Sequence, residues 1–398
     1  MTNTAPAASL AEVAAVFLKL GVTSFGGPVA HLGYFHEEIV RRRHWLDEAD
    51  YADLVALCNF LPGPASSQVV FALGMRRAGL PGAFAASACF TLPSAALLIL
   101  FAYGVTAVGD LRTAGWLHGL KLAAVAVVAQ AVWNLGRKLC PDRARITLAL
   151  AAAGAVLVLP GAVSQVGVIA IGALAGWELY RGAVADGNDS GARMARHHLW
   201  AAGALAVFFA LLFLLPAVVA VTHSKPVAVF DSFYRAGALV FGGGHVVLPL
   251  LRAEVVPPGW VTDDAFLAGY GAAQAVPGPL FTFSAYLGTL IRGGPDGWLG
   301  GLGCLFAIFL PAWLLIGGAL PFWHLLRSRR WTQAALRGAN AAVVGILLAA
   351  LYNPVWTQGV TNARDVAAAL GAFALLEIWR VPPWAVVVIA AAAGQWLL

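Results

Sequence analysis

The sequence predicts an all-α polytopic membrane protein: two inverted-topology repeats with broken, re-entrant helices, joined by one extra transmembrane helix. Three observations carry this prediction, namely the composition, a set of duplicated landmarks and the distribution of basic clusters. Of the 398 residues, 60% are hydrophobic and only 11% are charged, against about 25% charged in an average soluble domain. Mean hydropathy is +0.79, and many apolar runs reach the length that crosses ~30 Å of hydrocarbon as a helix. The short alternating segments of a β-barrel are absent from the sequence.

The landmarks show that one unit is used twice. They recur in the same order in both halves: Lys19–Gly27 with Arg235–Gly243, Trp45 with Trp260, Leu61–Pro64 with Val276–Pro279, Phe90–Pro93 with Ile308–Pro311, and Gly119–Asn134 with Gly338–Asn353. A repeated order of this kind is the sequence signature of an internal duplication. We therefore expect a first repeat at 9–181 and a second at 227–398.

Between the repeats lie two further segments. The stretch 182–198 is polar and rich in small residues, so it is expected to be a cytoplasmic linker loop. The run 199–221 is apolar and long enough to cross the membrane once, and it is expected to be the connecting transmembrane helix.

The basic clusters set the predicted topology. They lie at Arg41–Arg43, Arg76–Arg77, Arg137–Lys138, Arg193 with Arg196, and Arg327–Arg330. Cytoplasmic loops carry an excess of Lys and Arg, and nine full spans plus paired short helices place every cluster on that side. The second repeat then begins on the outside, so the repeats are inverted. The chain is expected to have a cytoplasmic N-terminus and a periplasmic C-terminus.

Each repeat contains two places that cannot be continuous helix. The glycine-rich breaks are Phe25-Gly26-Gly27-Pro28 and Phe241-Gly242-Gly243-Gly244, and the turns are Pro62-Gly63-Pro64 and Pro277-Gly278-Pro279. Glycine pairs and internal proline disfavour a helix. Non-helical backbone at membrane depth is tolerated where it is buried in protein or lines a wet cavity. Interrupted segments at corresponding places in two halves indicate a transporter binding site.

The chemistry beside these breaks suits an oxyanion. Pro28, Pro64 and Pro279 stand where new helices are expected to begin, and helix N-termini attract anions. The candidate side-chain donors near the breaks are Ser24, Ser66, Ser67, Gln68, Thr282 and Ser284, with Asn59 and Gln274 just before the turns. The alternative is that these hydroxyls bond back to their own helical turns.

Three cations inside apolar segments are further candidates. Lys19 and Arg235 occupy equivalent positions, each shortly before the glycine-rich break of its own repeat. Lys121 lies within the run 112–136. Intramembrane charges are functional candidates by default, although snorkelling to the interface is the alternative. We expect Glu12 to pair with Lys19.

The remaining polar residues near the breaks have weaker expectations. His31 and His245 could carry a proton, but interior histidines are more often structural. The segment His36-Glu37-Glu38 is expected to be a solvated helix end.

With its duplicated motifs, the sequence resembles the chromate ion transporter (CHR) family in its long two-domain form. The resemblance rests on Phe25–Pro28, Trp45-Leu46, Leu61–Pro64, Gly79–Gly82, Phe241–Gly244, Gln274 and Pro277–Pro279. It implies a bacterial inner-membrane protein that exports chromate, with sulfate as the look-alike substrate, and two homologous domains of opposite orientation. Family members are commonly described with thirteen segments. Ala65 departs from the polar residue expected after the first turn, which shifts weight to Ser66, Ser67 and Gln68.

Other readings are less consistent with the sequence. A transporter of sulfate or another tetrahedral oxyanion is the nearest alternative, and a membrane-embedded enzyme is the alternative from another class. The sequence lacks HExxH, CxxCH, a glycine-rich nucleotide motif and the ATPase motif GxxxxGK[ST]. We expect no cofactor, no metal and no nucleic-acid partner; the bilayer is the surrounding partner, and a homodimer stays open.

Overall fold

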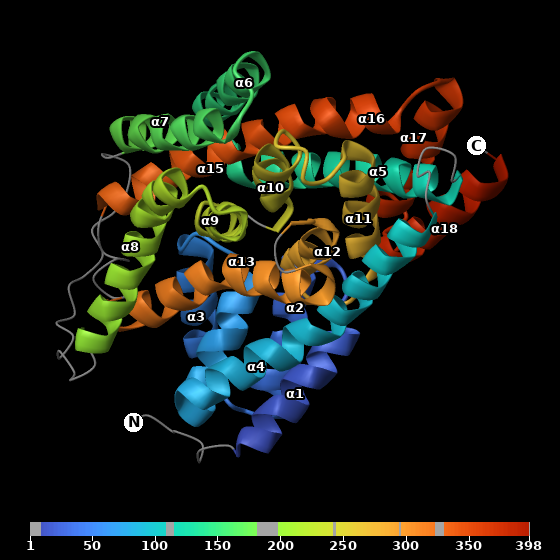
Figure 1. The fold of residues 1–398 in the computed structure, drawn as a ribbon. Helices are drawn as coiled ribbons and strands as arrows, with labels where there is room; N and C mark the ends of the chain where they lie inside the picture. Colours follow the sequence, from blue (N-terminus) through green and yellow to red (C-terminus); the bar gives the residue numbers. More distant parts are fainter. Residues whose placement is uncertain are drawn as a thin grey trace.

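A computed structural model of the protein describes residues 9–108, 115–180, 198–241, 244–293, 296–322 and 330–397, and every element in these ranges is helical (Figure 1). The first half contains α1 (Leu10–Thr23), α2 (Gly27–Phe35), η1 (His36–Arg42), α3 (Glu48–Phe60), α4 (Ala65–Val108), α5 (Gly115–Leu139), α6 (Arg143–Val158) and α7 (Ala162–Tyr180). Helix α8 (His198–Thr222) follows between the two halves. The predicted linker 182–198 lies outside the described residues, apart from His198.

The second half repeats the order of the first. It contains α9 (Lys225–Ala238), η2 (Gly244–Val246), α10 (Val247–Val255), α11 (Asp263–Ala275), η3 (Leu280–Thr282), α12 (Phe283–Leu290), α13 (Gly297–Ala319), η4 (Leu320–Phe322), α15 (Arg330–Ala350), η5 (Leu351–Trp356), α16 (Thr357–Gly359), α17 (Ala363–Glu377) and α18 (Pro383–Leu397). The all-helical prediction with two repeats and broken helices is therefore confirmed.

Side-chain caps explain where several helices begin. An N-cap oxygen accepts a hydrogen bond from a first-turn backbone N–H at α1, α3, α6, α11 and α17; the capping residues are Ser9, Asp47, Asp142, Thr262 and Asn362. These residue types satisfy the free N–H groups at a helix start. The caps of α3 and α11 fix the start of the helix that leads into each proline-glycine turn.

The two halves differ where the turn leads back into the membrane. In the first half, α4 runs for 44 residues, but Ala78 and Gly79 leave helical geometry (φ −142° and +63°). The first piece of α4 is thus a short helix like α12, and the second piece is a span like α13.

The number of long spans is smaller than the sequence suggested. Among the described residues, six helices are long and apolar enough to cross a membrane, at 65–107, 115–139, 163–180, 199–222, 297–322 and 333–359. Nine full spans were expected; the other three, α6, α17 and α18, are shorter helices of 15 or 16 residues. A full crossing needs about 20 residues.

The last helices of each half pack on the other half. Helices α6 and α7 lie along α15, while α17 and α18 pack on α5 (Figure 1). The backbones of Gly172 and Gly176 lie directly against Gly338, and those of Gly115 and Gly119 lie against Gly394. Small residues four apart allow this close approach between membrane helices. The exchange interlocks the two halves.

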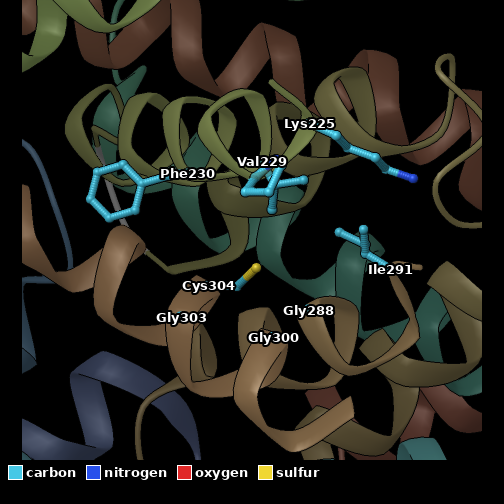
Figure 2. A pocket seen from close by; sticks show the side chains of 9 residues that line it. Lys225, Val229, Phe230, Gly288, Ile291, Gly300, Gly303 and Cys304 are labelled. Carbon is cyan, nitrogen blue, oxygen red and sulfur yellow. The ribbon is translucent and has the colours of Figure 1, made fainter. Parts of the chain in front are cut away.

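Away from the breaks, a cavity of about 110 Å³ lies between α9, α12 and α13 (Figure 2). A second cavity of about 210 Å³ lies between α7, α15 and the end of α9.

Candidate functional site

The broken segments of the two halves meet through a reciprocal pair of backbone hydrogen bonds. The amide of Gly63, in the first turn, donates to the carbonyl of Val240 at 2.7 Å, just before the second glycine-rich break. The amide of Gly278, in the second turn, donates to the carbonyl of Ser24 at 2.8 Å, just before the first break. Val240 and Ser24 occupy equivalent positions in the two repeats, so each turn is held by the break of the opposite half.

The local sequence explains why the chain breaks here. Gly26, Gly63 and Gly278 have φ of +93°, +114° and +96°, a region that only glycine enters without strain. Helix α2 begins at Gly27 with Pro28 in its first turn, and α4 begins directly after Pro64. Pro279 precedes η3, which leads into α12. The expected helix starts therefore follow the breaks; Gly242 and Gly243 lie outside the described residues.

Several buried polar atoms around this meeting point are unpaired. Within the described ranges, the following have no hydrogen-bond partner: Ser24 Oγ, His31 Nε2, Ser67 Oγ, Gln68 Oε1 and Gln274 Nε2. The side chains of Ser24, Ser67 and Gln68 are at most 3% exposed. Buried polar groups are nearly always paired, and an unpaired one costs about 1–3 kcal/mol. These five lie next to the breaks in the sequence, although other unpaired buried atoms, such as Ser87 Oγ and Gln165 Oε1, lie elsewhere. A bound polar ligand would explain the five.

Other predicted donors already serve the protein. Thr282 donates to the carbonyl of Pro279 at 2.8 Å, and Ser284 donates to that of Phe281 at 2.7 Å. These two hydroxyls therefore bond back to their own helical turns, which was the alternative to ligand binding. The amide nitrogen of Gln68 donates to the Pro62 carbonyl at 2.8 Å, which braces the first turn.

Asn59 lies apart from this set. Its side chain is exposed, and its amide donates to the carbonyl of Val55 one turn earlier in α3 at 2.9 Å. Gln274, its counterpart in α11, points an unpaired amide nitrogen into buried surroundings. The two positions just before the turns are therefore unequal.

The two histidines are placed differently from each other. His31 is fully buried, with Nδ1 3.5 Å from the hydroxyl of Ser66 and its ring edge-on to Phe90. His245 Nδ1 lies 2.8 Å from the hydroxyl of Tyr270 in α11. Each histidine thus contacts the helix beside the turn of its own half.

The three predicted cations are all paired with carboxylates. Lys19 lies 2.9 Å from Glu38, and Lys121 lies 2.6 Å from Asp264. Arg235 lies 3.4 Å from Glu254 and 2.8 Å from Asp231. Lys19–Glu38 and Arg235–Glu254 are equivalent pairs, because both acids follow their cation by 19 residues.

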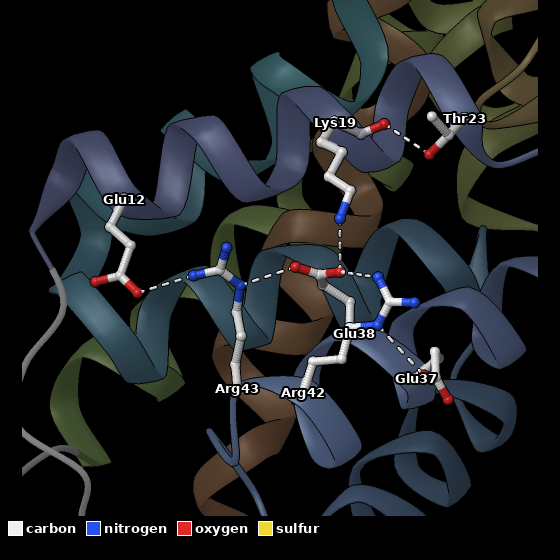
Figure 3. Close-up of polar contacts among 7 residues, drawn as sticks. All are labelled: Glu12, Lys19, Thr23, Glu37, Glu38, Arg42 and Arg43. Carbon is white, nitrogen blue, oxygen red and sulfur yellow. Dashed lines mark hydrogen bonds and ion pairs between the residues drawn. The ribbon is translucent and has the colours of Figure 1, made fainter.

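This pairing corrects two expectations. Glu12 does not pair with Lys19; it lies 3.1 Å from Arg43, as Figure 3 shows. Glu38 is not solvated, since it is 6% exposed and bridges Lys19 and Arg43 (Figure 3). A buried carboxylate requires such partners. The fold of η1 back onto α1 brings it there.

Sequence reasoning overlooked the acids and one hydroxyl. Glu38 and Glu254 could have been found from the repeat alignment, because they are equivalent in the two halves and follow equivalent cations. Ser94, in α4, faces the second turn closely: a Cβ on Gly278 would meet its hydroxyl at 2.8 Å. Its signal in the sequence was only a hydroxyl in an apolar run.

The aromatic residues of the glycine-rich breaks face apolar surroundings. The ring of Phe25 lies 6.2 Å from that of Trp384 in α18. Phe241 lines the 210 Å³ cavity with Leu239 and residues of α7 and α15. Neither this cavity nor the 110 Å³ one is lined by the unpaired donors. Among the described residues, no group of three or more His, Cys, Asp or Glu could hold a metal ion.

The chain is 29% identical to a "Chromate transport protein" of Pseudomonas aeruginosa over 99% of its own length and 93% of the relative. It is 28% identical to a "Probable chromate transport protein" of Synechococcus elongatus, over 98% of this chain and 96% of the relative. A "Chromate transport protein" of Cupriavidus metallidurans shares 27% identity over 88% of this chain and 83% of its own length.

No solved structure matches the chain at a significant level. The sequence model of one family, described as "Chromate transporter", matches the chain twice, at residues 11–177 and 227–395. Together these matches cover most of both halves, including all four broken segments, and the chain therefore belongs to the Chromate transporter family.

Proposed function

We propose that the protein transports chromate across the bacterial inner membrane and binds the anion near the midplane, where the four broken segments meet. The observation that carries the proposal is the cluster of unpaired buried donors, Ser24 Oγ, Ser67 Oγ and Gln274 Nε2. Membership of the family and the printed names of three relatives support chromate as the substrate.

The binding chemistry follows from the helix starts. A tetrahedral dianion sheds water on entering the protein and must replace those hydrogen bonds. The N–H groups at the starts of α2 and α4 carry partial positive charge, which favours an anion, and the unpaired hydroxyls and amide add neutral donors. Since Lys19, Lys121 and Arg235 each have carboxylate partners, their interaction with the substrate would require exchange of partners.

We propose an inverted arrangement of the repeats 9–181 and 227–398. The reciprocal bonds Gly63–Val240 and Gly278–Ser24 support a two-fold relation between the repeats. The basic clusters, which an inverted arrangement places on one side, favour an axis in the membrane plane. The N-terminus is then cytoplasmic, and the C-terminus is periplasmic. Outward movement of a dianion from a negative-inside cell is favourable by about 2.3 kcal/mol per charge per 100 mV, which supports export.

Sulfate is the second candidate substrate. It has the same tetrahedral shape and charge as chromate, and hydroxyl and amide groups would donate hydrogen bonds to either anion. Transport rather than enzymatic conversion is the activity that the family relatives support.

The test is flux into proteoliposomes containing the purified full-length chain. We expect saturable chromate uptake that an imposed membrane potential, positive inside the vesicle, accelerates. Sulfate in excess should compete if the site reads only shape and charge. Uptake no greater than in protein-free vesicles for both anions would overturn the proposal.

A further inference from the structure

The cavity between α9, α12 and α13 has a charged side chain, Lys225, at its mouth and an apolar interior. Its lining comes from Lys225, Pro226, Val229 and Phe230 of α9, Gly288 and Ile291 around the end of α12, and Gly300, Gly303 and Cys304 of α13. In Figure 2 the sulfur of Cys304 points into the space between α13 and α9, while Lys225 extends along the edge.

Glycines create this space. Gly300 and Gly288 are buried against each other, whereas Gly303 is exposed, and a Cβ placed on it would have no heavy atom of the described residues within 4 Å. An apolar cavity gives water few hydrogen-bond partners, so it favours hydrocarbon over water. With a volume of about 110 Å³, it fits a short length of acyl chain.

Exposed apolar side chains flank the cavity on α13. Helix α13 belongs to a candidate membrane span, and its residues flanking Gly303 are exposed and apolar: Leu299 is 53% exposed and Phe306 is 48% exposed. Lys225 begins α9, Ile291 follows the end of α12, and α13 begins at Gly297. The cavity therefore lies at a level where several helices end, which is where lipid headgroups are found.

Two cations stand at this level. The ammonium of Lys225 donates to the carbonyl of Arg292. Among the described residues it has no other hydrogen-bond partner, so two of its three N–H donors are left for a ligand there. Arg292 itself is exposed. Basic side chains at a membrane interface attract anionic lipid. An apolar groove with positive charge at its mouth complements a phospholipid, with the phosphate outside and the chain within.

We propose that this cavity is a binding site for one anionic phospholipid, whose phosphate contacts Lys225 and whose acyl chain enters between Val229 and Gly303. The site is separate from the meeting point of the breaks and does not depend on the proposed transport activity. Through α9, which ends at the second break, an occupant would also brace the helix that carries Arg235.

The test is native mass spectrometry of the purified full-length chain with added phosphatidylglycerol. We expect wild-type protein to retain one lipid that Gly303→Leu loses, with at least tenfold weaker retention, because the leucine fills the groove from open space. Gly317→Leu is the matched control, since it also lies on α13 with open space around it, and it should retain the lipid.

Further arms identify the headgroup. Lys225→Gln should weaken retention of phosphatidylglycerol several-fold, and phosphatidylcholine should bind wild type less tightly. Equal retention by wild type and Gly303→Leu would overturn the site. Equal binding of the two lipids would overturn recognition by charge, and displacement by millimolar inorganic phosphate would reduce the site to a phosphate ion site.

Discussion

The amide of Gly63 donates a 2.7 Å hydrogen bond to the carbonyl of Val240, 177 residues away and in the other half of the chain. Its counterpart joins Gly278 to Ser24 at 2.8 Å. Because the halves exchange these contacts, neither half builds the meeting point alone. The geometry of each turn is thus a property of the whole protein.

Gly63→Ala is predicted to lower chromate flux at least tenfold. At φ +114° a side chain is strained, and the new Cβ would lie 3.0 Å from the Gln68 amide nitrogen that braces the turn. Strain of this kind costs about 1–3 kcal/mol and would shift the amide that bonds Val240. Flux in proteoliposomes and thermal unfolding in detergent measure the two effects.

Gly161→Ala is the control for strain alone. Gly161 has φ +135°, and no heavy atom of the described residues lies within 4 Å of a Cβ there. It lies between α6 and α7, away from the breaks, so it should lose stability but keep flux. Wild-type flux in Gly63→Ala would show that the turn does not shape the site.

Removing one unpaired hydroxyl, that of Ser67, tests anion binding with little expected effect on the fold. Ser67→Ala removes a buried donor that has no partner within the described part of the chain, so the fold should tolerate it. If Ser67 donates to the anion, the apparent KM should rise about tenfold, because a hydrogen bond to a charged group contributes about 1.5–3 kcal/mol. Concentration-dependent flux provides the measurement.

Ser284→Ala serves as the comparison, because Ser284 already donates to the carbonyl of Phe281. Its apparent KM should stay within about twofold of wild type. The same shift in both variants would mean that unpaired hydroxyls mark no binding surface.

The breaks and helices could be predicted because proline, glycine and hydrophobic length act locally. The hydrogen bond between Gly63 and Val240 could not be predicted, since the partner of a backbone amide depends on the packing of distant helices. The pairing of Lys19 with Glu38 was missed for the same reason: η1 turns back onto α1, and nothing in the local sequence specifies that path. Spacing along α1 favoured an ion pair of Lys19 with Glu12 instead, but Glu12 pairs with Arg43.

A side chain at the glycine contact between the halves is expected to cause a large loss of stability. The backbone of Gly338 in α15 lies against Gly172 and Gly176 in α7, so any side chain there would collide with backbone. Gly338→Leu should force α7 from α15 and lower the unfolding temperature by many degrees, since overpacking costs about 1–3 kcal/mol or more. Gly154→Leu, in open space on α6, should behave like wild type. Equal unfolding temperatures for the two variants would contradict the packing account.

Acid stability should depend on Asp142, in the loop before α6. Hydrogen bonds from the Arg145 backbone amide and the Tyr180 hydroxyl, then the Arg145 guanidinium, lower the pKa of Asp142 to about 2. A lowered folded-state pKa means that this carboxylate stabilises the protein above its ordinary pKa near 4. The contribution is then lost as pH falls toward 2.

Asp142→Asn keeps a cap acceptor but does not titrate. Between pH 4 and pH 2, the unfolding temperature of wild type should therefore fall more steeply than that of Asp142→Asn, with the gap between them closing. Parallel curves across this window would exclude a role for the Asp142 charge.

Lys19 either contacts the anion during transport or only neutralises Glu38. Lys19→Gln leaves Glu38 paired with Arg43 at 2.9 Å and near Arg42 at 3.7 Å, so the protein should still fold. If Lys19 exchanges Glu38 for the anion during transport, flux should fall at least tenfold in Lys19→Gln and stay low in the double variant Lys19→Gln/Glu38→Gln. If Lys19 only neutralises Glu38, the double variant should restore flux, because it removes both members of the pair. The Arg235–Glu254 pair offers the same cycle in the second half, although there Asp231 would remain without its cation. Restoration in the first half would remove Lys19 from the binding site while leaving the unpaired donors at the breaks as its basis.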